Sequence, residues 1–170
     1  TLENAQIRKF GKSVELNSKV IQLPSSKQSL MASLDGKIVK YYVKEGDLVK
    51  KGDKVALIQS IELSRMSAEY LALKEQLKSM EENYNGNLIL NKRDIVSKQE
   101  LKLLNIQRKD ISAKLETIIS QLKTLDIEVK DIKNTISEYT LFAHNSGIVS
   151  SLLKTEYSAV SKDTEIVSIV

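Results

Sequence analysis

The sequence contains no cysteine and no tryptophan, and it has one proline, one histidine and six glycines in 170 residues. Without cysteine the chain can form neither a disulfide nor a thiolate metal site. One histidine cannot supply a two-histidine metal site, and it has no partners for a histidine-centred catalytic relay. No apolar run approaches the roughly twenty residues that a membrane-spanning helix needs. These gaps argue against disulfide, zinc and enzymatic chemistry, so we expect no cofactor.

The charges are numerous but mixed, with a formal net charge of +4 and a sequence pI of about 9.1. Basic and acidic residues alternate through the middle of the chain, and no basic block is interleaved with aromatic residues. This pattern is typical of a solvated helix surface and not of a nucleic-acid interface. We therefore expect no nucleic-acid partner.

The long middle of the chain, residues 61–138, carries apolar residues at alternating steps of three and four. In the first arm these are Leu63, Met66, Tyr70, Leu73, Leu77, Met80 and Tyr84. In the second arm they are Leu101, Leu104, Arg108 (the only polar member), Ile111, Leu115, Ile118, Leu122, Leu125, Val129, Ile132 and Ile136. Such a repeat gives each helix an apolar seam that must face another helix.

The repeat breaks at residues 91–97, so we predict an antiparallel coiled-coil hairpin with its tip there. Arms of about thirty to forty residues would be on the order of 45–60 Å long. Met66 and Met80 fall on the seam, where core packing explains them better than soft-metal binding. Gly86 in the first arm costs about 1 kcal/mol relative to alanine, and we expect some local loosening of the helix there.

Short strands separated by turns are predicted on both sides of this hairpin, in residues 28–60 and 139–170. The segment Gly36-x-Ile38-Val39 corresponds to Gly147-Ile148-Val149, and Val49-x-x-Gly52-Asp53 corresponds to Val160-x-x-Asp163-Thr164. Neither half has enough strands to fold alone. The sequence therefore predicts an α+β fold in which a long α-helical hairpin is inserted into one β-sandwich built from both halves.

Residues 1–27 are weakly patterned. The stretch from Val14 to Leu23 is predicted to form one or two short strands that end at Pro24 and belong to a sheet lying mostly elsewhere. The chain begins with Thr1 and not with methionine, which is what a mature form or a cut chain would show.

Two segments resemble the halves of a biotinyl/lipoyl domain. They are Met31-Ala32-Ser33-Leu34-Asp35-Gly36-Lys37-Ile38-Val39 with Val43-Lys44-Glu45-Gly46-Asp47-Leu48-Val49-Lys50-Lys51-Gly52-Asp53, and Ala143-x-x-x-Gly147-Ile148-Val149. A lipoyl-like domain split by a coiled-coil hairpin resembles the periplasmic adaptors (membrane fusion proteins, HlyD-like) of bacterial efflux and secretion systems. Residues 60–71 are similar to the heavy-metal-type adaptors of resistance-nodulation-division pumps, although Ile61 stands where those carry proline.

This resemblance implies a periplasmic subunit that links an inner-membrane transporter to an outer-membrane channel and self-associates into a ring. It also implies anchoring to the inner membrane in the full-length protein. The chain would then be a fragment, with residues 14–24 belonging to a mostly absent β-barrel domain. Three alternatives remain open, namely a type I secretion adaptor, a non-transport coiled-coil spacer, and a lipoylated or biotinylated enzyme subunit. The last lacks support because no Asp-Lys-Ala or Met-Lys-Met lies between the halves.

The hairpin tip is the candidate site for binding the outer-membrane channel. Ser97-Lys98-Gln99-Glu100 has the Ser-x-x-Glu form of a capping box, so the second helix should begin at Ser97. The adaptor family carries an Arg–Leu–Ser pattern at its tip, and here Leu90 and Ser97 match while Gly86 stands at the arginine position. The predicted channel-binding residues are Leu90, Lys92, Arg93, Ile95, Val96, Ser97 and Leu101. His144 is expected to be a half-exposed turn residue, with a metal-ligating role as the alternative.

Overall fold

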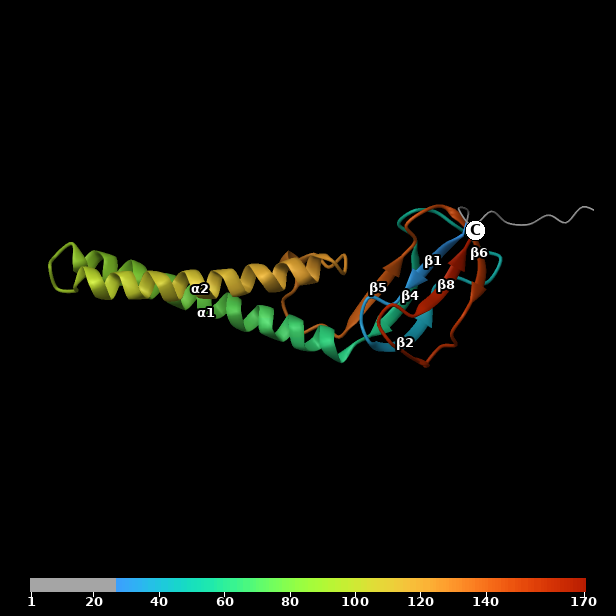
Figure 1. Cartoon of the computed structure of the whole chain (residues 1–170), viewed down its shortest axis with the longest axis horizontal. Helices are drawn as coiled ribbons and strands as arrows, with labels where there is room; N and C mark the ends of the chain where they lie inside the picture. Colours follow the sequence, from blue (N-terminus) through green and yellow to red (C-terminus); the bar gives the residue numbers. More distant parts are fainter. Residues whose placement is uncertain (1–26) are drawn as a thin grey trace, which may run out of the picture.

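The computed structural model describes residues 27–170 and consists of a β-sandwich from which a two-helix rod projects (Figure 1). The strands are β1 (Gln28–Met31), β2 (Gly36–Tyr41), β3 (Leu48–Val49), β4 (Lys54–Gln59), β5 (Glu138–Phe142), β6 (Gly147–Leu152), β7 (Ala159–Val160) and β8 (Glu165–Ile169). The helices are α1 (Ile61–Asn91), α2 (Lys98–Lys123) and the short 3-10 helix η2 (Val129–Asp131). The strands predicted at residues 14–24 lie outside the described residues.

Both sheets of the sandwich are antiparallel and draw strands from both halves of the chain. One sheet has the order β1-β8-β6-β3 and the other has the order β5-β4-β2-β7. Each therefore contains two strands that precede the helices and two that follow them. The sandwich can form only when the hairpin returns the chain to the place where it left, as the sequence predicts.

The two halves pair in equivalent ways. In one sheet Gly36 pairs with Val160, and in the other Gly147 pairs with Val49. Both glycines lie where another backbone passes very close, because a Cβ would stand 2.2 Å from the Gln59 carbonyl oxygen at Gly36 and 2.6 Å from the Val170 carbonyl oxygen at Gly147. A side chain at either position would force the backbone apart, which explains why both halves use glycine there.

The hydrophobic core fills the sandwich and continues into the base of the rod. Its largest fully buried apolar side chains are Leu30, Ile38, Val49, Val55, Ile58, Val149, Ile166, Val167 and Ile169 in the sandwich, with Leu63 and Leu122 in the helices. Full burial of one such side chain contributes about 1.5–3 kcal/mol. The buried side chains at the base of the hairpin thus belong to the same core as those of the sheets.

Helix α1 leaves β4 with a single residue, Ser60, between them. The Ser60 hydroxyl accepts a hydrogen bond from the Leu63 amide at 3.4 Å and caps the helix. With 31 residues in α1 and 26 in α2, the helices are about 47 and 39 Å long. Helix α1 runs through Gly86 without interruption. Among the described residues, no helix is both long and apolar enough to cross a membrane.

The second arm ends earlier than its apolar repeat predicts. Helix α2 stops at Lys123, whereas the repeat continued to Ile136. Asp126 adopts a φ of 56°, and the Ile127 amide donates to the Leu122 carbonyl at 3.3 Å, which closes the helix. Residues 124–137, which we call the returning segment, run from the end of α2 back to β5 as a turn, the short helix η2 and extended chain. The helical interpretation of this stretch was wrong.

Candidate docking site at the hairpin tip

The tip loop is closed by a hydrogen-bonded helix end. The Ile95 amide donates to the Leu90 carbonyl at 3.1 Å and the Asp94 amide donates to the Asn91 carbonyl at 3.0 Å, while Asp94 has a φ of 56°. This is the Schellman arrangement, in which one left-handed residue satisfies the last free carbonyls of a helix. The Asn91 side-chain amide also donates to the Val96 carbonyl at 2.7 Å. The loop between the helices is therefore held in a defined shape.

Ser97 begins the second helix. Its hydroxyl accepts a hydrogen bond from the Glu100 amide at 3.1 Å, and its backbone is extended while Lys98 is already helical. The predicted N-cap position is confirmed in the structure. The side chain of Glu100 lies in the first turn of α2, where a negative charge is favourable to the helix dipole.

The tip presents apolar and cationic side chains to solvent. Ile95 is 67% exposed and Leu90 is 37% exposed. Lys92 and Arg93 are exposed beside them, as is Ser97, whereas Val96 and Leu101 are half-buried. All seven predicted tip residues are thus brought together at the end of the rod farthest from the sandwich (Figure 1).

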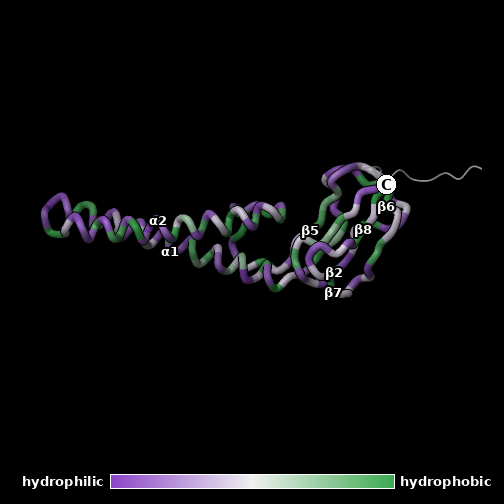
Figure 2. The backbone as a smooth tube through the Cα atoms, in the orientation of Figure 1, coloured by the Kyte–Doolittle hydropathy of each residue, from purple (hydrophilic) through white to green (hydrophobic). Residues whose placement is uncertain are grey.

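Sequence reasoning missed three further exposed apolar residues near the tip. Ile89 is 55% exposed on α1, and Leu103 and Ile106 are 57% and 55% exposed on α2. The last two line a shallow groove with Lys98, Gln99 and Lys102. All three are apolar residues outside the seam repeat. They could have been predicted to be exposed for that reason. Figure 2 shows hydrophobic and hydrophilic residues alternating along both helices up to the tip.

Positive charge also gathers toward the tip. Between residues 88 and 109 the basic residues are Lys92, Arg93, Lys98, Lys102, Arg108 and Lys109, and the acidic residues are Asp94 and Glu100. An apolar surface surrounded by positive charge complements a partner that offers apolar side chains and carboxylates.

The first turns of α1 are tied to the returning segment by a buried serine. Ser67 is fully buried, and its hydroxyl accepts a hydrogen bond from the Ile136 amide at 3.0 Å and lies 3.0 Å from the Ile136 carbonyl oxygen. The Ser60 amide donates to the Ser137 carbonyl at 2.7 Å. The returning segment is thereby fastened along the first turns of α1, just before it enters β5.

A buried tyrosine ties β5 to the loop that follows β1. The Leu34 amide donates to the Tyr139 hydroxyl at 3.2 Å. Burial raises the pKa of Tyr139 above its usual value, against smaller opposite effects of the hydrogen bonds to the backbone of Leu34 and Ser33. The phenol therefore stays protonated and acts as a neutral hydrogen-bonding group within the sandwich.

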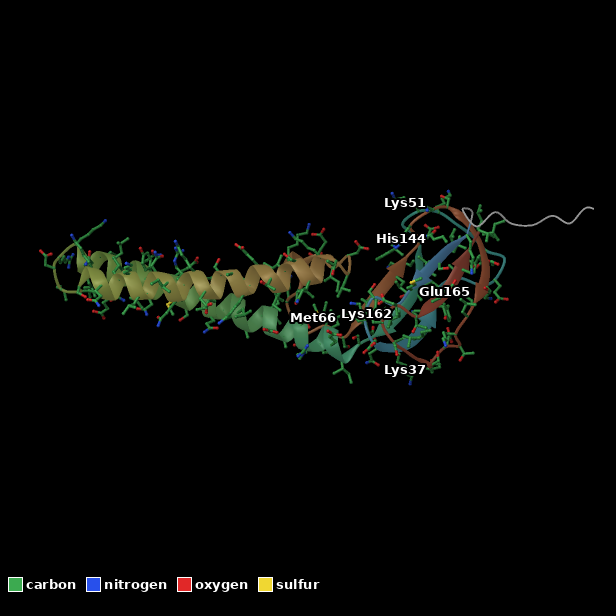
Figure 3. All side chains as sticks on the ribbon, in the orientation of Figure 1. Lys37, Lys51, Met66, His144, Lys162 and Glu165 are labelled. Atoms are coloured by element: carbon green, nitrogen blue, oxygen red, sulfur yellow. The ribbon has the colours of Figure 1, made fainter. Side chains whose placement is uncertain are left out.

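His144 lies on the sandwich, in the turn between β5 and β6, far from the tip (Figure 3). It is exposed, where the sequence suggested half-exposure. Within residues 27–170 there is no group of three or more histidine, cysteine, aspartate or glutamate side chains that could hold a metal ion. Met66 is buried at the base of the hairpin, whereas Met31 is 48% exposed on the sandwich. The methionines are therefore not gathered into one site.

A sandwich made from two flanking halves, with a two-helix rod inserted between them, is the fold of the membrane fusion proteins. The chain has this fold.

Two solved structures illustrate the likeness. One is ZneB from Cupriavidus metallidurans, with a TM-score of 0.66 and 15% identity over 86% of this chain and 61% of that one. The other is a MacA–MexA chimera that carries the α-hairpin domain of Pseudomonas aeruginosa MexA, with a TM-score of 0.57 and 25% identity over 84% of this chain and 46% of that one. The chain thus spans about three fifths of the first protein and about half of the second. No protein-family model and no curated protein matches the sequence.

Proposed function

We propose that this chain is the hairpin-bearing part of a periplasmic adaptor that links an inner-membrane transporter to an outer-membrane channel in a tripartite efflux system. One observation carries the proposal. A rod about 47 Å long is fixed at its base in a folded core and ends in an ordered loop with exposed apolar and cationic side chains. A structure of this kind spans a distance and makes contact at its far end.

The sandwich supports a spacer role over a carrier role. Its two equivalent halves favour the interpretation of a split biotinyl/lipoyl-like domain. In a carrier domain the junction of the halves would present a modifiable lysine, but here β4 passes through Ser60 into α1 and the returning segment leads into β5. The hairpin therefore replaces the turn that would carry the modifiable lysine. No catalytic step is needed for the role that we propose.

At the tip, helix-in-groove packing explains the residue types. Leu90, Ile95, Val96 and Leu101 would supply the apolar contact, Lys92 and Arg93 would meet carboxylates of the channel, and Ser97 would fix the start of α2. This chain has Gly86 where the family pattern has arginine, and Lys92 and Arg93 would supply the missing positive charge.

The sandwiches of several copies would pack side by side into a ring, which requires head-to-tail contacts between different faces. The full-length protein would be anchored to the inner membrane. The exported substrate would be a metal ion or a drug, and the similarity of residues 60–71 to metal-type adaptors favours the former. A type I secretion adaptor remains the second candidate, because it would share the hairpin and the split sandwich.

The proposal is tested with a double substitution at the tip, Ser97→Arg with Leu101→Asp, in the full-length protein. We expect export to be lost while the melting temperature of the sandwich changes little, because both residues lie far from the core. Thr117→Arg, at an exposed position on the same helix nearer the base, is the matched control and should leave export intact. Full export by the tip variant would refute a role of the tip in docking.

A further inference from the structure

The outer part of the hairpin is held much less firmly than its base. In α1 the buried residues are Leu63, Met66, Ser67 and Tyr70, all within its first ten positions. In α2 the buried residue nearest the tip is Ile111. Beyond these the seam consists of half-buried side chains such as Met80, Leu88 and Leu104. Packing alone therefore does little to fix the register of the two helices toward the tip.

The composition of α1 weakens this region further. Asn83, Asn85, Gly86 and Asn87 follow one another within five residues, and all are poor helix formers. A Cβ placed at Gly86 would meet nothing within 4 Å, so no close approach of another chain segment requires glycine there. The helix is continuous through this stretch, but neither its propensity nor its burial holds it in one position.

Arg108 lies on the seam in this same region and makes two contacts across it. Its guanidinium carbon is 5.2 Å from the centre of the Tyr84 ring, and its Nη1 atom is 3.9 Å from Glu81 Oε1. Its Nη2 atom donates to Asn105 Oδ1 at 3.1 Å on its own helix. An aromatic ring face and a carboxylate are both favourable partners for a guanidinium cation.

The arginine at this position also lowers the stability of the hairpin. The Nε atom of Arg108 is buried and has no hydrogen-bond partner among the described residues. A polar side chain at a seam position typically lowers the stability of a coiled coil while specifying one register. A leucine at this position would bury more apolar surface and would accept several neighbouring alignments equally well.

We propose that Arg108 is a positioning residue that sets the register of the outer hairpin, and thereby the orientation of the tip loop. Only one alignment places Tyr84 under the guanidinium and Glu81 beside it at the same time. A shift of α2 along α1 by one turn, about 5.4 Å, removes both contacts. The benefit of one fixed register rests on the proposed docking function of the tip. The alignment of the two helices itself depends only on contacts within the hairpin.

The test measures the register directly and needs no partner protein. Lys78→Cys on α1 and Lys102→Cys on α2, both exposed, are introduced into the 170-residue chain, which has no native cysteine, and are spin-labelled. Pulsed electron-electron double resonance then gives the distribution of distances between the two labels. We expect one narrow distribution in the otherwise unchanged chain.

Arg108→Leu is expected to add a second population, displaced by about one helical turn or more, while the melting temperature stays the same or rises. Arg108→Lys, which keeps the charge but lacks the planar fork, should also show the second population. Lys109→Leu removes the same charge from an exposed neighbouring position and should keep the single distribution. A single unchanged distribution in both Arg108 variants would overturn the proposal. Because no channel takes part, this result is independent of whether the tip docks as proposed.

Discussion

Two aspartates end the two long helices in a conformation that suits glycine better. Asp94 closes α1 at the tip and Asp126 closes α2 at the base, each with a φ of 56°. A residue with a side chain is strained in this left-handed region, although aspartate tolerates it better than most. A negative charge at the C-terminus of a helix also opposes the helix dipole. Both helix ends are therefore less stable than they would be with glycine at these positions.

Asp126→Gly is expected to stabilise the chain by about 0.5–1 kcal/mol, because it removes both the strain and the unfavourable charge. Urea unfolding followed by circular dichroism measures the change. Asp126→Asn is the control, since it removes the charge but keeps the side chain, and it should give a smaller gain. A loss of stability in the glycine variant would mean that the aspartate side chain makes a contact that the chain requires.

At this scale the sequence predicted the start of α2 better than its end. Ser97 could be recognised as an N-cap because Glu100 follows at the right spacing, and the hydrogen bond is present. The end of α1 falls within the predicted break at residues 91–97, whereas the end of α2 at Asp126 could not be recognised, because the apolar repeat continues past it. The left-handed conformation of Asp94 and Asp126 is accompanied by hydrogen bonds from each loop to the helix before it.

The returning segment shows how one pattern can describe two structures. Leu125, Val129 and Ile132 continue the seam spacing of α2, so a longer helix was predicted. The same stretch also alternates, with Leu125, Ile127 and Val129 separated by charged residues, which is the pattern of extended chain. The structure follows neither pattern in full, because Leu125 lies in a turn and Val129 lies in η2. Leu125 and Ile132 both pack into the core, where they are 9% and 3% exposed.

Ser67→Ala tests whether this segment is held by the serine on α1. The substitution leaves the partly buried Ile136 amide without its acceptor, which costs about 1–3 kcal/mol. Thermal unfolding should show the corresponding drop in stability, and the Ile136 amide should lose protection from hydrogen exchange.

Ser79→Ala, at an exposed position on the same helix, is the matched control for the higher helix propensity of alanine. It should be neutral or slightly stabilising. Equal stability of the Ser67 and Ser79 variants would contradict the role that we assign to Ser67 in fastening the returning segment.

The molecule as a whole is built from two equivalent halves separated by the rod. The Ala32 amide donates to the Thr164 carbonyl, and at the equivalent place the Ala143 amide donates to the Asp53 carbonyl, both at 2.9 Å. The sequence predicted this correspondence from the turn spacing and from Gly36 and Gly147. It could not predict that Tyr157 and Asp163 adopt positive φ values where the first half has Gly46 and Gly52. The pairing of the strands imposes this conformation on side chains that do not favour it.

Gly36→Ala and Gly147→Ala test this equivalence. Each added Cβ would meet backbone at well under 3 Å, so both variants should lose stability to a similar degree, by about 1–3 kcal/mol. Gly86→Ala is the control within the same chain, because its Cβ would meet nothing within 4 Å, and it should gain about 1 kcal/mol. Chemical denaturation measures all three. A neutral effect at only one of the two sandwich glycines would mean that the halves are not equivalent in packing.

In the role that we propose, the tip of the rod contacts an outer-membrane channel. It is tested most directly by placing Ser97→Cys in the full-length protein, crosslinking in cells, and identifying the captured protein by mass. Thr117→Cys, exposed on α2 nearer the sandwich, is the control for proximity along the rod. We expect the cysteine at position 97 to capture an outer-membrane channel and the cysteine at position 117 not to capture one. Capture of only a second copy of the same chain from position 97 would contradict docking of the tip on a channel and would favour a structural rod that assembles tip to tip.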